Sequence, residues 1–155
     1  MNFDYEDHDG LALAALVRNG ELSAGELLDA ALRRIAAANG ELNAVVTPLY
    51  EQARAAVAAG LPAGPFEGVP FLVKELVASV AGVPTTSASR LYAHNVPPAD
   101  SEVVARFRRA GLVIVGKTNS PEFGLSPTTE SLLYGVTRNP WQLDLSPGGD
   151  RKSDV

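Results

Sequence analysis

Apolar residues in the first third of the chain recur with the three- and four-residue spacing of amphipathic helices. Residues 11–19 predict a short helix that ends at Gly20. The segment Ser23–Glu26 has the form of a capping box, in which a serine and a glutamate each satisfy a free backbone donor of the other. A second helix is therefore predicted to follow, with the apolar positions 27, 28, 31, 32 and 35 on one face, and Asn39-Gly40 is expected to end it.

Shorter apolar runs in the middle of the chain are typical of strands. Residues 44–47 predict one strand, and a helix is expected from Pro48 to about residue 59. Farther along, the run 69–77, a helix capped by Asp100 or Ser101 that ends at Gly111, and the buried run 112–115 follow in the order strand, helix, strand. This order predicts a βαβ unit and therefore part of an α/β sheet. Residues 60–70, 79–98 and the part after 117 are predicted as loops.

Composition narrows the classes of function. The chain is 46% hydrophobic and 20% charged, which is a globular balance, and its net charge of −5 argues against a nucleic-acid partner. It contains no cysteine, and His8 and His94 lie too far apart to suggest a metal motif. The acidic start Met1–Asp9 does not have the basic and then apolar order of a signal peptide, and no apolar run is long enough to span a bilayer. A cytoplasmic protein without a membrane partner is predicted.

The segment Gly111–Thr118 satisfies the phosphate-loop pattern G-x-x-x-x-G-K-[ST], which would indicate a nucleotide-binding module. That site needs a flexible loop between a strand and a helix, with backbone donors facing the phosphates. Here the four middle residues are Leu, Val, Ile and Val, which predict the strand itself, and Asn119–Pro121 predicts a turn. We therefore interpret the match as a coincidence, with Lys117 at the strand end reaching solvent.

Lys74 stands inside the apolar run Val69–Val77, where a strand would place it on the same face as Leu72 and Leu76. Burial disfavours the charged form of an amine, and a neutral amine can act as a general base. The alternative, which spacing alone favours, is a lysine whose stem lies along apolar surface while its ammonium reaches water.

Several stretches, taken together and in order, resemble the amidase signature family from about Leu11 to Gly149. They are Gly20–Leu28, Gly64–Leu76, Pro84–Ser89, Asp100–Gly111, Val115–Gly124, Thr137–Trp141 and Pro147–Gly149. The resemblance implies the mixed-sheet α/β fold of that family, with N-terminal helices followed by βαβ elements, here as an incomplete copy.

The resemblance also implies a function, which is hydrolysis of a carboxylic amide by a Ser–Ser–Lys triad in which Lys74 is the catalytic lysine. A neutral lysine takes a proton from a bridging serine, which in turn deprotonates the nucleophilic serine. No metal or organic cofactor is required, and the partner of the full-length parent is a small-molecule amide. Glu75 replaces the aspartate that usually follows the lysine. The family also includes a tRNA-linked amidotransferase subunit, which stays open as an alternative.

The chain departs from the family pattern after Gly149. The bridging serine is expected where Asp150 stands, and the nucleophilic serine belongs to a later segment that this chain does not contain. We therefore expect residues 1–149 to be the N-terminal part of an amidase domain and residues 150–155 to be a divergent polar tail, produced by a truncation or a frameshift. The chain alone is predicted to be inactive. The alternative is a non-catalytic remnant or binding protein with the amidase fold.

Other polar and aromatic residues are given no catalytic role. Ser87 and Ser89 are expected to form loop hydrogen bonds, although the resemblance places them beside the substrate region. Glu130 is interpreted as a solvated charge or a residue near the site. Trp141 is expected to pack beneath its loop as core.

Overall fold

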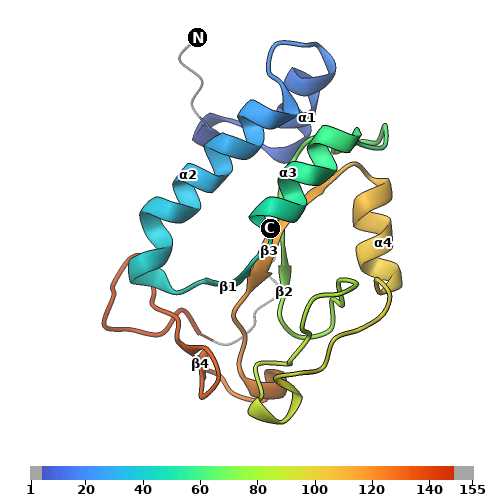
Figure 1. Ribbon diagram of the computed structural model, residues 1–155. Coiled ribbons are helices and arrows are strands. Elements are labelled where there is room, and N and C mark those ends of the chain that lie inside the picture. Colours follow the sequence, from blue (N-terminus) through green and yellow to red (C-terminus); the bar gives the residue numbers. More distant parts are fainter. Residues whose placement is uncertain (1–4, 149–155) are drawn as a thin grey trace.

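Three strands form the central sheet of the computed structural model, which describes residues 5–148 (Figure 1). Strand β3 (Val113–Thr118) lies in the middle of the order β1-β3-β2. Strand β1 (Val45–Pro48) pairs with it in the antiparallel sense, and β2 (Pro70–Lys74) pairs with it in parallel. The prediction of a mixed α/β fold is confirmed.

The three predicted N-terminal helices are present, but the third begins at Tyr50 rather than at Pro48, which belongs to the preceding strand, and the second ends later than predicted. They are α1 (Gly10–Arg18), α2 (Ala24–Leu42) and α3 (Tyr50–Ala59), and the capping box at the start of α2 is present. The prediction that Asn39-Gly40 ends α2 is wrong, because the helix continues to Leu42 and ends at Asn43, whose φ of 50° is left-handed. The Asn39 side chain accepts from the backbone N–H groups of Ala44 and Val45 and donates to the Val45 carbonyl, so it organises the turn beyond the helix.

The predicted βαβ unit is confirmed as β2, α4 (Glu102–Arg109) and β3. Its strands differ in length from the prediction. Strand β2 stops at Lys74, and the residues up to Val77 form a turn, whereas β3 continues past its apolar run to Thr118. The strand form of residues 113–118 confirms that the phosphate-loop pattern is a coincidence, because their backbone donors belong to the sheet.

The two faces of the sheet are covered by different helices (Figure 1). One cluster joins the sheet to α4 and the segment before it, and consists of Leu49, Val73, Ala78, Val80, Val83, Val104 and Ile114. A second joins β3 to α2 and α3, through Leu28, Ala53, Val113 and Val115. A third ties α1 to α2 and to the start of β2, through Leu13, Ala14, Leu27 and Val69. These contacts hold the sheet rigidly and leave its edge at Lys74 and Thr118 as the place where loops meet.

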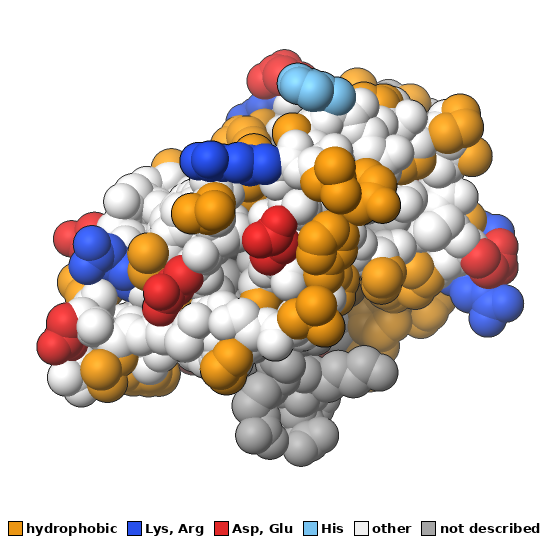
Figure 2. Space-filling model, turned by 90° about the horizontal axis from the view of Figure 1, so that it is seen from below, with side chains coloured by type: hydrophobic (Ala, Val, Ile, Leu, Met, Phe, Trp, Pro, Cys, Tyr) orange, Lys and Arg blue, Asp and Glu red, His pale blue; other side chains and the backbone are white. Residues whose placement is uncertain are grey.

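Loops and short elements make up the rest of the described chain. These are three 3-10 helices, Tyr5–Asp7, Arg90–Tyr92 and Glu122–Gly124, and a hairpin of β4 (Glu130–Ser131) and β5 (Gly135–Val136). The prediction that Trp141 packs as core is wrong, because its side chain is 94% exposed. Hydrophobic side chains also gather in a band on the lower face of the molecule (Figure 2). Among the described residues, no helix is long and apolar enough to cross a membrane.

Candidate active site

Lys74 is the last residue of β2, and its register partner Thr118 is the last residue of the parallel strand β3. The two residues therefore lie at the carboxyl ends of neighbouring parallel strands, an edge where α/β sheets commonly bind ligands. The Lys74 Nζ is a buried atom. The alternative in which this ammonium reaches water is thus wrong, because the structure places the amine inside the protein.

The residue after Lys74 is held at each of its polar groups. The Glu75 N–H donates to the Thr118 carbonyl at 3.0 Å, and its carbonyl accepts from Ser120 Oγ at 3.1 Å. One carboxylate oxygen accepts from the backbone N–H and the hydroxyl of Thr86, at 2.6 and 2.9 Å. The other forms an ion pair of 2.6 Å with the Lys117 Nζ. The backbone at the end of β2 is therefore anchored to β3 and to the segment 84–86.

The prediction that Lys117 reaches solvent is wrong, because its side chain and that of Glu75 are both 0% exposed. Its ammonium donates to the Pro84 carbonyl at 2.8 Å and to Thr85 Oγ1 at 3.0 Å, in addition to the contact with Glu75. Burial lowers the pKa of Lys117 from its ordinary value, while its hydrogen bond to Glu75 and the charge of that residue act in the opposite direction. This pair was not predicted from the sequence. The signal that could have indicated it is an acidic residue and a basic residue that each lie inside or beside an apolar run.

A continuous set of hydrogen bonds connects this sheet edge to the loop that leads to Gly148. The Asn119 side chain donates to the Gly135 carbonyl and to Thr137 Oγ1. The Thr137 N–H donates to the Thr129 carbonyl, and Thr129 Oγ1 donates to the Gly148 carbonyl at 2.9 Å. The segment that precedes Asp150 is thereby tied to the strand that ends beside Lys74. Asp150 itself lies outside the described residues.

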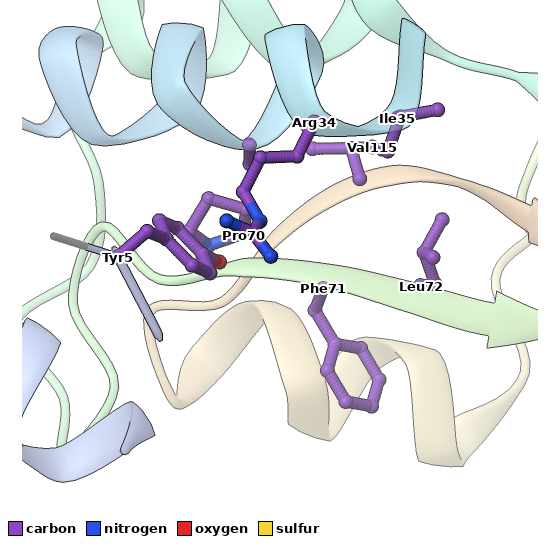
Figure 3. A pocket seen from close by; sticks show the side chains of 8 residues that line it. Tyr5, Arg34, Ile35, Pro70, Phe71, Leu72 and Val115 are labelled. Atoms are coloured by element: carbon purple, nitrogen blue, oxygen red, sulfur yellow. The ribbon is translucent and has the colours of Figure 1, made fainter. Parts of the chain in front are cut away.

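A cavity of about 230 Å³ lies between α2 and the start of β2, at the opposite end of that strand from Lys74 (Figure 3). Its lining is mostly apolar, and its polar members are Tyr5 and Arg34. Arg34 forms an ion pair with Glu6, and its guanidinium lies 5.6 Å from the centre of the Tyr5 ring. Burial raises the pKa of the Tyr5 phenol, and the charge of Arg34 opposes that change. This cavity therefore holds a satisfied cation and offers no group for amide chemistry.

The remaining candidate residues have structural surroundings. Ser87 Oγ donates to the Leu76 carbonyl, and Ser89 Oγ accepts from the Leu91 N–H, so both form loop hydrogen bonds as predicted. Glu130 is exposed. Among the described residues, no group of three or more His, Cys, Asp or Glu side chains could hold a metal ion.

Comparison with known proteins identifies the family to which this chain belongs. The Amidase family model matches residues 26–150. The chain is 46% identical over 143 residues to 6-aminohexanoate-cyclic-dimer hydrolase of Paenarthrobacter ureafaciens, a match that covers 91% of this chain and 29% of that relative. It is 44% identical over 144 residues to a glutamyl-tRNA(Gln) amidotransferase subunit of Salinispora arenicola, a match that covers 88% of this chain and 29% of that one. The chain thus spans about 29% of the length of the curated relatives it matches.

Solved structures show the same likeness. A 6-aminohexanoate cyclic dimer hydrolase complexed with substrate superposes with a TM-score of 0.86 at 43% identity, over 92% of this chain and 30% of that one. A bacterial aryl acylamidase of the amidase signature enzymes superposes with a TM-score of 0.84 at 31% identity, over 92% of this chain and 31% of that one. By sequence and by fold, the chain belongs to the amidase signature family.

Proposed function

We propose that this chain supplies the general base of an amidase active site and that Lys74 is that base. The observation that carries the proposal is the buried Nζ of Lys74 at the carboxyl edge of two parallel strands. Membership of the amidase signature family supports amide hydrolysis as the reaction in which that amine takes part. The position also has the rigid backbone that proton transfer requires, because the neighbouring Glu75 is bonded through its N–H, its carbonyl and its carboxylate.

The proposed reaction is acyl transfer to a serine followed by hydrolysis. The neutral Lys74 amine accepts a proton from a bridging serine, which takes a proton from the nucleophilic serine as that oxygen attacks the amide carbon. The C–N bond breaks, and the leaving nitrogen takes a proton back through the same relay. Water then attacks the ester, releases the acid and restores the serine. No metal or organic cofactor enters this sequence of steps.

The 155-residue chain is proposed to be inactive alone, because the expected bridging position holds Asp150. Within this proposal, residues 1–149 are amidase domain and residues 150–155 are a divergent tail. Small-molecule amides are the proposed substrates of the complete protein, by analogy with the cyclic-dimer hydrolase. A role like that of the amidotransferase protein is the second candidate, which the 44% identity to it supports. A cytoplasmic location stays a prediction.

A chimera tests the assignment of Lys74. Residues 11–148 of this chain would replace the matching segment of the Paenarthrobacter hydrolase, which supplies the rest of the domain. We expect the chimera to hydrolyse the cyclic dimer of 6-aminohexanoate, and Lys74→Ala to reduce kcat at least about a hundredfold, the lower range for loss of acid–base catalysis. Arg54→Ala is the matched control, because this cation is half-exposed on α3 and pairs with Asp29.

Two results would contradict the proposal. A folded Lys74→Ala chimera with unchanged kcat would remove Lys74 from the chemistry. Turnover of amides by the 155-residue chain itself would show that the expected serines are not needed. An inactive chimera that folds and melts like the parent hydrolase would favour the alternative of a non-catalytic remnant.

A further inference from the structure

Lys74 and the residue that follows it, Glu75, are ionisable side chains at the end of β2 that lie on different faces of the sheet. Val73 pairs with Lys117 and Lys74 pairs with Thr118, and successive residues of a strand point to opposite faces. Lys117 and its partner Glu75 therefore lie on the face covered by the segment 84–86, which both of them contact. Lys74 points to the other face. The ion pair is therefore connected to the Lys74 amine through the backbone, because Glu75 follows Lys74 in the chain, and it lies on the opposite face of the sheet.

We propose that the Glu75–Lys117 ion pair is a positioning device for Lys74, which clamps the backbone at the end of β2 and keeps the buried charge beside the amine balanced. The catalytic meaning of this inference rests on the function proposed above. The structural part of the proposal can be tested without measuring enzyme activity, because it concerns only residues that this chain contains.

The evidence for this clamp on the backbone is that the polar groups of Glu75 and the ammonium of Lys117 all have partners. The Lys117 ammonium has three protons and three partners, which are Glu75, Pro84 and Thr85. Both carboxylate oxygens of Glu75 are engaged, and so are its N–H and its carbonyl. The residue that follows Lys74 is thus held from three directions, by β3, by Ser120 and by the segment 84–86. A backbone anchored in this way fixes where the Lys74 side chain begins.

The charge balance follows from burial. Both side chains are 0% exposed, so neither charge is screened by water. With both present, the two charges of the pair cancel. Removing only Lys117 leaves a buried carboxylate that favours the protonated form of a nearby amine, and removing only Glu75 leaves a buried ammonium that favours the neutral form. The Tyr134 hydroxyl adjoins this cluster through a hydrogen bond of 3.1 Å with Thr86.

Nuclear magnetic resonance of the full chain tests the charge balance. The chain has three lysines, Lys74, Lys117 and Lys152, so their side-chain carbons can be assigned by substitution and followed against pH. We expect Lys117→Met to raise the pH midpoint of the Lys74 signal by about one unit, and Glu75→Gln to lower it by about as much. The double variant should return it to within about 0.3 unit of wild type. Glu102→Gln is the matched control, because it breaks an exposed ion pair with Arg106 and should shift nothing.

Glu75→Asp tests the clamp, and it keeps the charge in case the single neutral variants do not fold. One methylene less shortens the reach to Lys117 and Thr86, so amide hydrogen exchange at positions 75 and 86 should accelerate at least about tenfold. The Lys74 midpoint should stay unchanged. Midpoints that move in the same direction in both neutral variants, or not at all, would overturn the charge balance. Unchanged exchange in Glu75→Asp and in the double variant would overturn the clamp. Either result leaves the Lys74→Ala chimera as an independent test of the function.

Discussion

Residues 10–118 and residues 119–148 are held together by different forces. In the described chain, the buried hydrophobic core lies between Leu13 and Val115, and Pro121 is a buried apolar side chain beyond it. After residue 119, large apolar side chains are instead exposed, among them Leu125, Leu132 and Trp141. The second region is attached through polar groups, since Asn43 donates to the carbonyls of Tyr134 and Val136.

The difference teaches what each region contributes to the site. Apolar burial makes the first region rigid, so it can hold Lys74 and its strand in place. Hydrogen bonds from amide and hydroxyl side chains direct the second region towards the sheet edge, and they are specific in geometry but weaker in net free energy. Residues 10–118 therefore act as the scaffold, and residues 119–148 form loops that are held against the sheet edge near Lys74. Four substitutions test this distinction.

The largest effect is expected from Lys117→Met, which leaves Glu75 buried without its counter-ion. Loss of one partner of a buried pair costs about 3–5 kcal/mol of unfolding free energy. Urea denaturation of the two chains would measure the difference. The exposed pair of Arg106 and Glu102 is the control, because Glu102→Gln removes a charge that water already screens and should leave the unfolding free energy nearly unchanged. Equal losses in the two variants would contradict the importance of burial.

The same pair also makes stability depend on pH. Burial lowers the pKa of Lys117 in the fold, so between that value and the unfolded value the unfolded chain binds more protons. Unfolding free energy then rises with pH. We expect the stability of wild type relative to Lys117→Met to increase as the pH approaches about 10.4 from below. A difference that decreases over that alkaline range would show that Glu75, rather than burial, dominates.

Leu28→Ala should destabilise the scaffold by about 3 kcal/mol, because it opens a cavity between α2 and β3. Leu28 is 1% exposed and packs with Val113 and Val115. Thermal and urea unfolding would measure the loss. Leu132→Ala is the matched control, because the same change at a side chain that is 73% exposed removes little contact. A small loss at Leu28 would mean that the helices are not held by this core.

Thr137→Val should cost about 1–2 kcal/mol, because it keeps the shape and removes a buried hydroxyl with two partners. Thr137 Oγ1 donates to the Asn43 carbonyl at 2.8 Å and accepts from the Asn119 side chain at 2.9 Å. Hydrogen exchange should accelerate in residues 129–137 and stay unchanged in β3. Thr128→Val serves as control, since that hydroxyl bonds only with the nearby Ser126 among the described contacts. Acceleration in β3 would show that the two regions unfold together.

The smallest effect is expected from Trp141→Ala. The side chain is 94% exposed, so its removal should change the unfolding free energy by less than about 0.5 kcal/mol. Fluorescence cannot follow this variant, because the chain has a single tryptophan, so circular dichroism would be used. A loss of more than about 1 kcal/mol would place Trp141 in the scaffold after all.

Much of the scaffold could be predicted from the sequence, because its signals are local. The capping box at Ser23 starts α2, and the apolar run before Lys117 forms the buried strand. The pattern also places Lys74 in a strand, although it predicts a strand that runs on to Val77, whereas β2 ends at Lys74. Its role, by contrast, came from resemblance to the amidase signature family and stays a prediction, since spacing alone favoured a solvent-reaching lysine.

The errors share a physical cause, which is that the deciding partner lies far away in sequence. Lys117 was expected in solvent as a residue at the end of a buried strand, while Glu75, 42 residues earlier in the sequence, meets it only in the fold. The end of α2 depends on Asn43, which is bonded to Thr137, 94 residues away. Trp141 was expected to pack beneath its loop, and its exposure depends on packing that no local pattern describes. Tertiary contacts overrode local preference in each case.

The order of strands in the sheet has a consequence for synthesis of the protein on the ribosome. Strand β3 is central, yet it is the last of the three to be made. At about 5–20 residues per second, β1 and β2 emerge seconds before the neighbour to which both pair. During that interval neither strand has a sheet to join, and the apolar side chains of β2 have only the early helices to shield them. We therefore expect nascent chains to associate most readily after Pro70 has been made and before Val113 has been made. A chaperone that binds extended apolar segments would act during this period.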